Sequence, residues 1–394
     1  MKKIITILFA LFNMFNLAAQ DNTLTYDELI QNGGGLNTIT TAVPFLLIAP
    51  DSRSGAMGDV GVATSPDANA MHWNPAKLAF ANADMGATMS YVPWLRALVS
   101  DISLSYLAGY MRLDERQVVG LDLRYFSLGD ITFTDIEGST IGQFKPHELA
   151  LGGSYARKLT DRFSLAISGR YIYSDLTGGQ LAGSIKTAAG QAFAADISGF
   201  YTTDVRISGY DMNLAFGGNI SNLGNKISYT ETTDGDFIPI NLRLGTAIET
   251  NIDDYNSVSL AIDMNKLLVP TPPLRNTDNS VAFGKEDQVG VVSGIFQSFG
   301  DAPGGFKEEF REINYSIGSE YWYANQFAVR AGYFFEHATK GGRKFFTFGS
   351  GVKYSSFVLD FSYLMNATRD AGGTNPLANT MRFSMTWNFG ATDS

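Results

Sequence analysis

From Met85 onward the sequence repeats one short-range pattern, in which large apolar residues alternate with polar or small residues. In Phe163–Tyr171, for example, the large apolar residues share one face, while Ser164, Ser168 and Arg170 share the other. A period of two residues is that of a β-strand with one face against an apolar environment. The pattern therefore predicts a protein whose main body is built from strands.

About fourteen such segments can be counted. They lie near residues 85–94, 99–112, 117–129, 147–158, 162–175, 209–220, 225–231, 239–250, 256–266, 311–323, 326–337, 343–354, 356–368 and 379–390. Most are long enough to cross a bilayer when tilted, which takes roughly 9–11 residues. Bacterial single-chain membrane barrels have an even number of strands. We predict an all-β protein, an outer-membrane antiparallel β-barrel of about fourteen strands.

The first twenty residues have the layout of a signal peptide. Two lysines precede an apolar run from Ile4 to Leu17, and a small pair, Ala18–Ala19, follows. We expect cleavage beside Gln20 and export. No other window holds the ~18 apolar residues that a membrane-spanning helix needs. The expected organisation is a signal peptide (1–20), an N-terminal segment without strands (21–84) and a transmembrane barrel (85–394).

The connections between the predicted strands fall into two classes. Short ones lie at 113–116, 159–161, 221–224, 251–255, 324–325 and 355, and long ones include 130–146, 176–208, 267–310 and 369–378. Short turns at one end and long loops at the other are typical of outer-membrane barrels, with both termini in the periplasm. A soluble sandwich also alternates, but it does not require this asymmetry, an even strand count and a signal peptide together.

Composition excludes several classes of site and partner. The 394 residues contain no Cys, so neither a disulfide framework nor a thiolate metal site is available, and a lipoprotein anchor is excluded as well. Charged residues make up 17% and the formal net charge is -10. A general nucleic-acid binder would carry a basic face, so we expect no nucleic-acid partner.

The segment before the first strand has glycines and a turn motif that suit the interior of a barrel. Gly55, Gly58 and Gly61 allow close packing against a wall. Pro75 fixes a turn, and Asn74 can cap backbone groups that would otherwise be buried unpaired. Together with Ala76, these residues predict a hatch, a plug inside the barrel that keeps the membrane sealed.

Two resemblances fit this organisation. Gly58–Ala63 leading to Asn74-Pro75-Ala76 resembles the start of the FadL family of outer-membrane transporters for hydrophobic compounds, in which this tripeptide lies in an N-terminal hatch inside a barrel of about fourteen strands. A closer resemblance is to the PorV (LptO) family, FadL-like barrels of the type IX secretion system of Bacteroidetes. It rests on Phe45–Asp59, Met71–Leu78 and Tyr91–Leu95.

The closer resemblance implies a carrier in the cell outer membrane that is not an enzyme. Such a protein docks on the large outer-membrane translocon barrel and accepts secreted proteins by their C-terminal signal domains. It then passes them to the surface attachment (sortase) complex, while outer-membrane lipid surrounds it. The alternative is FadL-like transport of hydrophobic compounds, with an apolar groove outside and a hatch that opens sideways.

Two long loops carry candidate partner-binding residues. The loop 176–208 has an apolar tip that includes Ile185, Ala192 and Phe193, and exposed apolar surface on a rim usually marks a partner. The same tip could instead fold over its own barrel as a lid. In the loop 267–310, the stretch 289–299 is apolar enough for a short helix, and we single out three of its residues, Val292, Ile295 and Phe296.

Catalytic and metal sites find little support in the sequence. The three histidines, His72, His147 and His337, are not accompanied by a signature that marks a nucleophilic serine. Asp130, Asp135 and Glu137 share one predicted loop, but their spacing is not that of a calcium motif. We therefore expect no catalytic residue, no metal and no cofactor.

Overall fold

The structure is a computed structural model that describes residues 36–96, 99, 101–134, 137, 139–179, 181–182, 185–207, 209–230, 235–276, 278–367, 377 and 379–390. The predicted signal peptide lies outside these residues. Within them, no helix is both long and apolar enough to cross a membrane.

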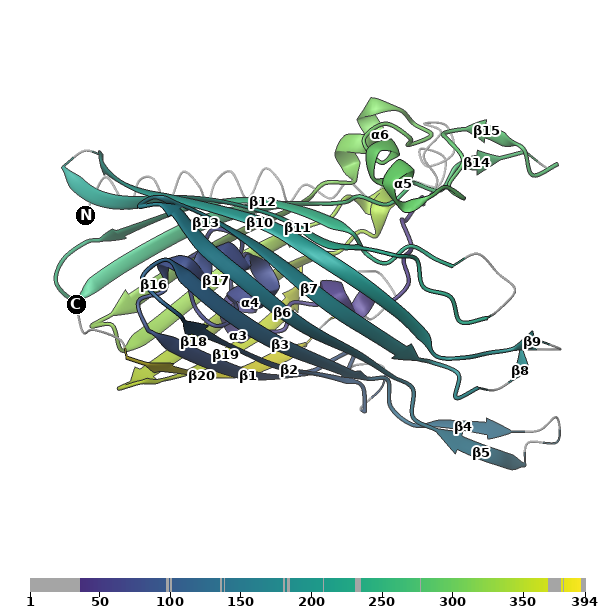
Figure 1. Ribbon diagram of the computed structural model, residues 1–394, viewed down its shortest axis with the longest axis horizontal. Helices are drawn as coiled ribbons and strands as arrows, with labels where there is room; N and C mark the ends of the chain where they lie inside the picture. The colour runs from purple at the N-terminus through teal and green to yellow at the C-terminus, as the bar shows by residue number, and fades with distance from the viewer. Residues whose placement is uncertain are drawn as a thin grey trace.

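The described chain forms a closed antiparallel barrel of fourteen strands (Figure 1). The strands are β1 (Met85–Pro93), β2 (Ser103–Arg112), β3 (Gln117–Ser127), β6 (His147–Thr160), β7 (Phe163–Asp175), β10 (Gly190–Ile207), β11 (Tyr210–Gly224), β12 (Asn241–Asn251), β13 (Asn256–Leu267), β16 (Asn314–Tyr323), β17 (Phe327–Phe335), β18 (Lys344–Tyr354), β19 (Phe357–Asn366) and β20 (Met381–Phe389). Pairing of β1 with β20 closes the wall. The predicted fold class is confirmed.

The alternation along the strands separates an apolar outside from a mainly polar inside. Leu121 and Ile167 point outward and are 68% and 63% exposed. Arg124 and Asp263 face the interior and are buried. An apolar band around a closed wall with a polar lumen is the surface of a transmembrane barrel.

One of the fourteen strands was predicted in the wrong place. The loop expected at 176–208 contains a barrel strand, β10, whereas the strand expected at 225–231 belongs to the connection between β11 and β12. Ile227 forms only an isolated bridge with Asp236 there. The short connection expected at 221–224 therefore moves to residues 208–209, between β10 and β11.

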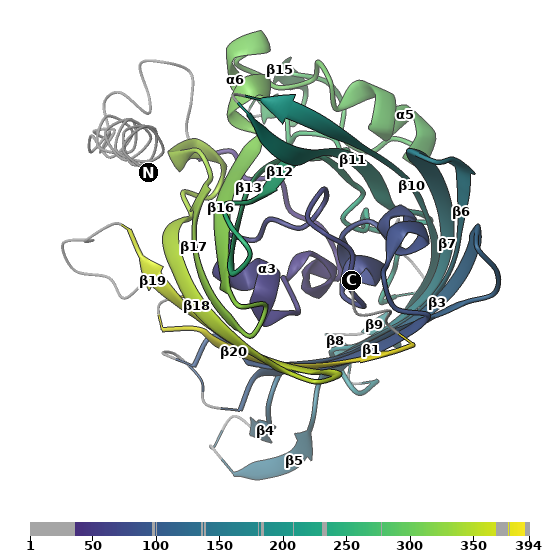
Figure 2. The ribbon, with the colours of Figure 1, turned by 90° about the vertical axis from the view of Figure 1, so that its left-hand side faces the viewer.

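In residues 36–84, the described part of the segment before β1, there are four short helices: η1 (Pro44–Leu47), α3 (Ser52–Ala56), α4 (Ala70–Trp73) and η2 (Pro75–Phe80). They lie within the ring of strands when the barrel is viewed along its axis (Figure 2). Their side chains share buried clusters with wall residues, for example Met57 and Ala76 with Ala166 and Phe200. We call residues 43–84 the hatch segment.

The two ends of the barrel differ. At the loop end, the long connections carry three small hairpins, β4 (Ile131–Thr134) with β5 (Thr140–Phe144), β8 (Leu181–Ala182) with β9 (Ile185–Lys186) and β14 (Leu274–Arg275) with β15 (Val281–Phe283). The same end carries α5 (Val291–Gln297), α6 (Phe306–Arg311) and η3 (Ala338–Lys340). The opposite end, the turn end, has short connections.

The first and last described residues lie at opposite ends of the barrel, whereas the two termini, predicted to share the turn end, lie outside the described residues. Asn37 donates from its backbone to Thr339 O (3.0 Å) and from its side chain to Glu308 (3.1 Å), and both partners lie at the loop end. The last strand, β20, finishes beside the start of β1 at the turn end. The described chain thus runs from the loop end through the lumen and leaves the hatch segment at the turn end.

Candidate functional site

The glycines of the hatch segment stand where the wall or a hatch neighbour approaches too closely for a side chain. Gly58 has a φ of +72°, and a Cβ there would lie 2.7 Å from the backbone of Tyr333. A Cβ on Gly61 would meet the Trp73 ring at 2.3 Å. Only glycine combines a positive φ with such an approach, so Gly58 seats the hatch segment directly against β17.

Asn74 links the hatch segment to itself and to the wall. Its Oδ1 accepts from Ala76 N (3.1 Å), and its Nδ2 donates to Val62 O and Gly199 O (3.0 Å each). Pro75 begins η2 directly after it. Asn74 is fully buried, so these hydrogen bonds pair groups that lie away from water. The Ala76 N–H also donates to Ser198 Oγ (3.2 Å).

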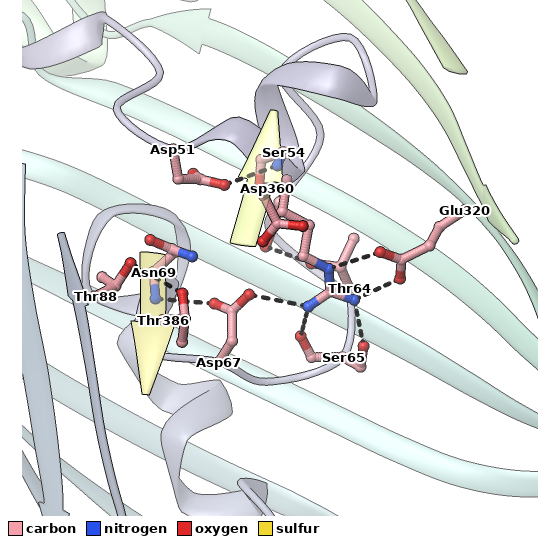
Figure 3. A network of polar contacts seen from close by, with 12 residues as sticks. Asp51, Ser54, Thr64, Ser65, Asp67, Asn69, Thr88, Glu320, Asp360 and Thr386 are labelled. Carbon is pink, nitrogen blue, oxygen red and sulfur yellow. Dashed lines mark hydrogen bonds and ion pairs between the residues drawn. The ribbon is translucent and has the colours of Figure 1, made fainter. Parts of the chain in front are cut away.

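Two acids on the wall, Glu320 and Asp263, hold the hatch segment. No sequence pattern predicts which hatch residues they contact. Arg53 lies between Asp67 (3.0 Å) and Glu320 of β16 (2.7 Å), and Ser65 completes its contacts (Figure 3). Asp263 accepts from the backbone N–H groups of Gly61 (2.7 Å) and Val62 (2.9 Å). The Asp-Ser-Arg-Ser run of the hatch motif was visible in the sequence, but Glu320 is 267 positions from Arg53, and Asp263 is 202 positions from Gly61.

The apolar start of the hatch segment fills the lumen at the loop end. The ring of Phe45 stacks on that of Phe126, with 6.1 Å between centroids. Phe45 and Leu46 are both buried, in a cluster that includes Ile172, Ile238 and wall residues of several strands. The protein's own side chains therefore occupy the apolar part of the lumen.

The helix α5 has two different apolar faces. Ile295 packs against the lumenal cluster, and a Cβ on Gly294 would lie 2.8 Å from the Phe237 ring, so this face rests on the barrel. Val292 and Phe296, one helical turn apart, are 69% and 76% exposed on the other face. Phe299, Phe306 and Phe310 of the same connection are also exposed, and we call these five residues together the α5–α6 apolar face.

Buried ion pairs fix α6 to the rim that carries this face. Lys340 contacts Glu308 (2.5 Å) and Glu312 (3.0 Å), and Lys266 contacts Glu309 (3.1 Å) and Glu312 (2.6 Å). Burial acts to raise the pKa of Glu308, but the Lys340 ammonium outweighs it and holds that pKa below its usual range. The α5–α6 apolar face thus stands on a rigid base.

The three residues predicted for the tip of the loop 176–208 are not part of the α5–α6 apolar face. Ala192 and Phe193 belong to β10 rather than to a loop tip, because alternating residues of this stretch face the lumen and the outside. Ala192 points inward and is 1% exposed, whereas Phe193 points outward, 69% exposed, against the Tyr171 ring (5.2 Å). Ile185 lies in β9 at the loop end.

The histidines are not gathered into one site. His147 contacts the backbone of Lys145 through Nδ1 (3.1 Å), His337 contacts Thr339 (2.9 Å), and His72 lies in the hatch segment. In the described part of the chain, no group of three or more His, Asp or Glu is arranged to hold a metal ion. Asp135, from the predicted acidic loop, lies outside the described residues.

The sequence model of the family described as type IX secretion system protein PorV matches residues 31–274. The chain belongs to the PorV family. Its role is accordingly that of an outer-membrane protein of the type IX secretion system. No sequence among the curated proteins matches the chain.

Several solved structures share the arrangement of strands. The toluene transporter TodX of Pseudomonas putida is 13% identical, with 89% of this chain and 98% of that one covered and a TM-score of 0.48. The toluene transporter TbuX of Ralstonia pickettii is 15% identical (87% and 98% covered, TM-score 0.45). A FadL homologue of Pseudomonas aeruginosa is 10% identical (90% and 100% covered, TM-score 0.43). At these values the likeness to this PorV-family chain carries no functional argument.

Proposed function

We propose that this PorV-family barrel is a docking and shuttle protein. It binds the large translocon barrel at the loop end, receives secreted proteins by their C-terminal signal domains, and passes them to the surface attachment complex. The loop end faces the cell exterior and the turn end faces the periplasm. The observation that carries the proposal is the α5–α6 apolar face, a set of exposed aromatic and aliphatic side chains beyond the end of the wall.

An apolar face on a packed helix is a better binding surface for a protein partner than a solvated loop would be. Exposed apolar patches rimmed by polar residues mark interaction sites on proteins, and aromatic side chains contribute most to binding when they enter a partner's pocket. Phe296 and Val292 project from a helix whose opposite side is packed on the barrel. Binding therefore requires little ordering of the helix, which favours affinity.

The rival function, uptake of a hydrophobic compound, lacks this support. Such a carrier needs an apolar space in the lumen and a path through the hatch or the wall. Phe45 and Leu46 fill the apolar lumen, and consecutive strands pair along their length, with shifts only at Lys158/Thr160 and at Ala195/Ile197. A deletion strain should lose surface display of secreted proteins while its growth on hydrophobic substrates is unchanged.

Phe296→Asp tests the docking surface directly. Because a charged side chain in an apolar contact is costly to desolvate, we expect at least a tenfold loss of translocon recovered with the tagged barrel. Heat-modifiable migration of the barrel should be unchanged, because Phe296 points away from the fold.

Phe193→Asp is the matched comparison for this test. Phe193 is an exposed aromatic of the same type, but it stands on the outer wall beside Tyr171, where we expect lipid to cover it. Its replacement should leave co-purification near the wild-type level. If Phe193→Asp abolished recovery and Phe296→Asp did not, the docking surface would be the wall and the proposed role of the α5–α6 apolar face would be wrong.

A further inference from the structure

Several buried hydrogen-bond donors inside the barrel have no acceptor. They are the N–H of the His72 ring, Nη2 of Arg124, Nε of Arg170 and the hydroxyl of Tyr106, none of which has a partner among the described residues. These four side chains belong to residues that are 5% exposed or less. Native proteins leave few buried donors unpaired, and each one calls for a physical explanation.

The strand register brings three of these side chains to one patch of the inner wall. Tyr106 on β2 is directly opposite Arg124 on β3. Arg170 on β7 lies across Gly152, which is in turn opposite Asp122 on β3. Two strand spacings are about 10 Å, and the Asp122 carboxylate lies over Gly152, with Oδ1 2.2 Å from where a Cβ would stand.

His72 faces this patch from the hatch segment. Its helix, α4, packs against β3, and the positive charges of Arg124, Arg243 and Arg170 all act on its ring. The backbone oxygen of His72 accepts from Arg243 Nη1 (3.1 Å). These four residues therefore lie in one region between the hatch segment and the wall, which we call the arginine chamber.

The carboxylates near the arginine chamber leave part of its positive charge without a close partner. Asp122 meets Arg124 at 3.3 Å, and Asp196 meets Arg170 at 2.9 Å. No ion pair within the described residues reaches Arg243, which lies over the Trp73 ring at 5.0 Å instead. Asp263 forms no ion pair with Arg243: its Oδ2 accepts from the backbone N–H groups of Gly61 and Val62, and its Oδ1 has no partner among the described residues.

We propose that a small inorganic anion, of the size and charge of chloride, binds in the arginine chamber. It accepts hydrogen bonds from Arg124, Arg170, Tyr106 and the N–H of His72, and the charge of Arg243 stabilises it. Charge-assisted hydrogen bonds to anions are about twice as strong as neutral ones. Because His72 belongs to the hatch segment and the other donors to the wall, the anion ties the hatch segment in place. This site is independent of the proposed docking role.

The full-length barrel purified in detergent tests the site with halides as the probe. Crystals grown in sodium bromide should show an anomalous peak within hydrogen-bond reach of Arg124 and Arg170. The unfolding temperature should be higher by about 2–5 °C in chloride or bromide than in gluconate of equal ionic strength, because a ligand that binds only the folded state stabilises it. Ordered water alone in the chamber, with no halide dependence, would overturn the proposal.

Two conservative variants separate a bound anion from a general salt effect. Tyr106→Phe removes one donor without changing the shape of the side chain, so the halide-dependent shift should shrink by about half or more. Tyr110→Phe is the control, because Tyr110 is also buried on β2 but its hydroxyl donates to Ala83 O (3.3 Å). Equal halide shifts in both variants and in the wild type would contradict the assignment, as would an anomalous peak that survives in Tyr106→Phe combined with Arg124→Gln.

Discussion

Single buried residues decide how the hatch segment sits in the lumen. Asn74 was predicted from the sequence as a capping residue, and its three hydrogen bonds to Val62, Gly199 and Ala76 have that geometry. The pairing of Arg53 with Glu320 could not be predicted, because nothing local relates two residues 267 positions apart. Local backbone chemistry was thus readable from the sequence, whereas contacts across the lumen depend on the closed wall.

Asn74→Ala should loosen the hatch segment. The substitution removes the side-chain donor to the Val62 and Gly199 carbonyls, whereas the Ala76 N–H keeps the Ser198 hydroxyl (3.2 Å) as a partner. Each buried group left without a partner costs about 1–3 kcal/mol. We expect the barrel to assemble but the outer membrane to admit large antibiotics, measured as a lower inhibitory concentration.

Asn69→Ala is the matched control for this effect. Asn69 is equally buried in the hatch segment, but its side-chain oxygen has no partner among the described residues. Its replacement should leave permeability at the wild-type level. Unchanged permeability in Asn74→Ala as well would show that the hatch segment does not seal the pore through this residue.

At the scale of secondary structure, residue size decided which elements could be predicted. β10 was missed because alanines stand on both of its faces, with Ala192 and Ala194 inward and Ala195 outward, which hides the period of two. The opposite error occurred at 225–231, where Ile227 and Tyr229 alternate like a strand but lie in a connection. The helix in the loop 267–310 was expected, and α5 occupies residues 291–297.

The attachment of α6 should depend on Lys340 and on pH. Lys340→Ala leaves Glu308 and Glu312 buried without one of their cations, and breaking a buried pair in this way costs about 3–5 kcal/mol. We expect faster hydrogen exchange in residues 291–311. Arg275→Ala is the control, since its ion pairs with Glu286 and Asp287 are largely exposed and such pairs contribute little.

The pH dependence of this attachment has a definite sign. The pKa of Glu308 in the folded protein lies below its ordinary value of 4.5, so its contribution to stability is present above that value. It is lost as the pH falls through the lowered folded pKa. The protection factors of residues 291–311, which are exchange rates corrected for the intrinsic pH dependence, should therefore fall below about pH 4.5. Protection that stays constant down to pH 3 would contradict the role of Glu308.

At the scale of the whole molecule, the proposed sealing of the lumen and the proposed binding of partners take place at different positions along the barrel axis. The hatch segment fills the lumen, with apolar residues at the loop end and the Arg53 network nearer the turn end. The number of strands and the difference between short and long connections were predictable, because both follow from the repeated alternation. A closed barrel permits few other arrangements of such strands. The contact of Asn37 with the loop end was not predictable, because nothing in the sequence before Val43 shows which end it contacts.

A photo-crosslinking residue placed at Phe296 in living cells tests the central claim most directly. The proposed docking of the α5–α6 apolar face predicts a covalent product with the large translocon barrel, and the same probe at Phe193 should react mainly with lipid. A translocon product at Phe193 and none at Phe296 would contradict the account.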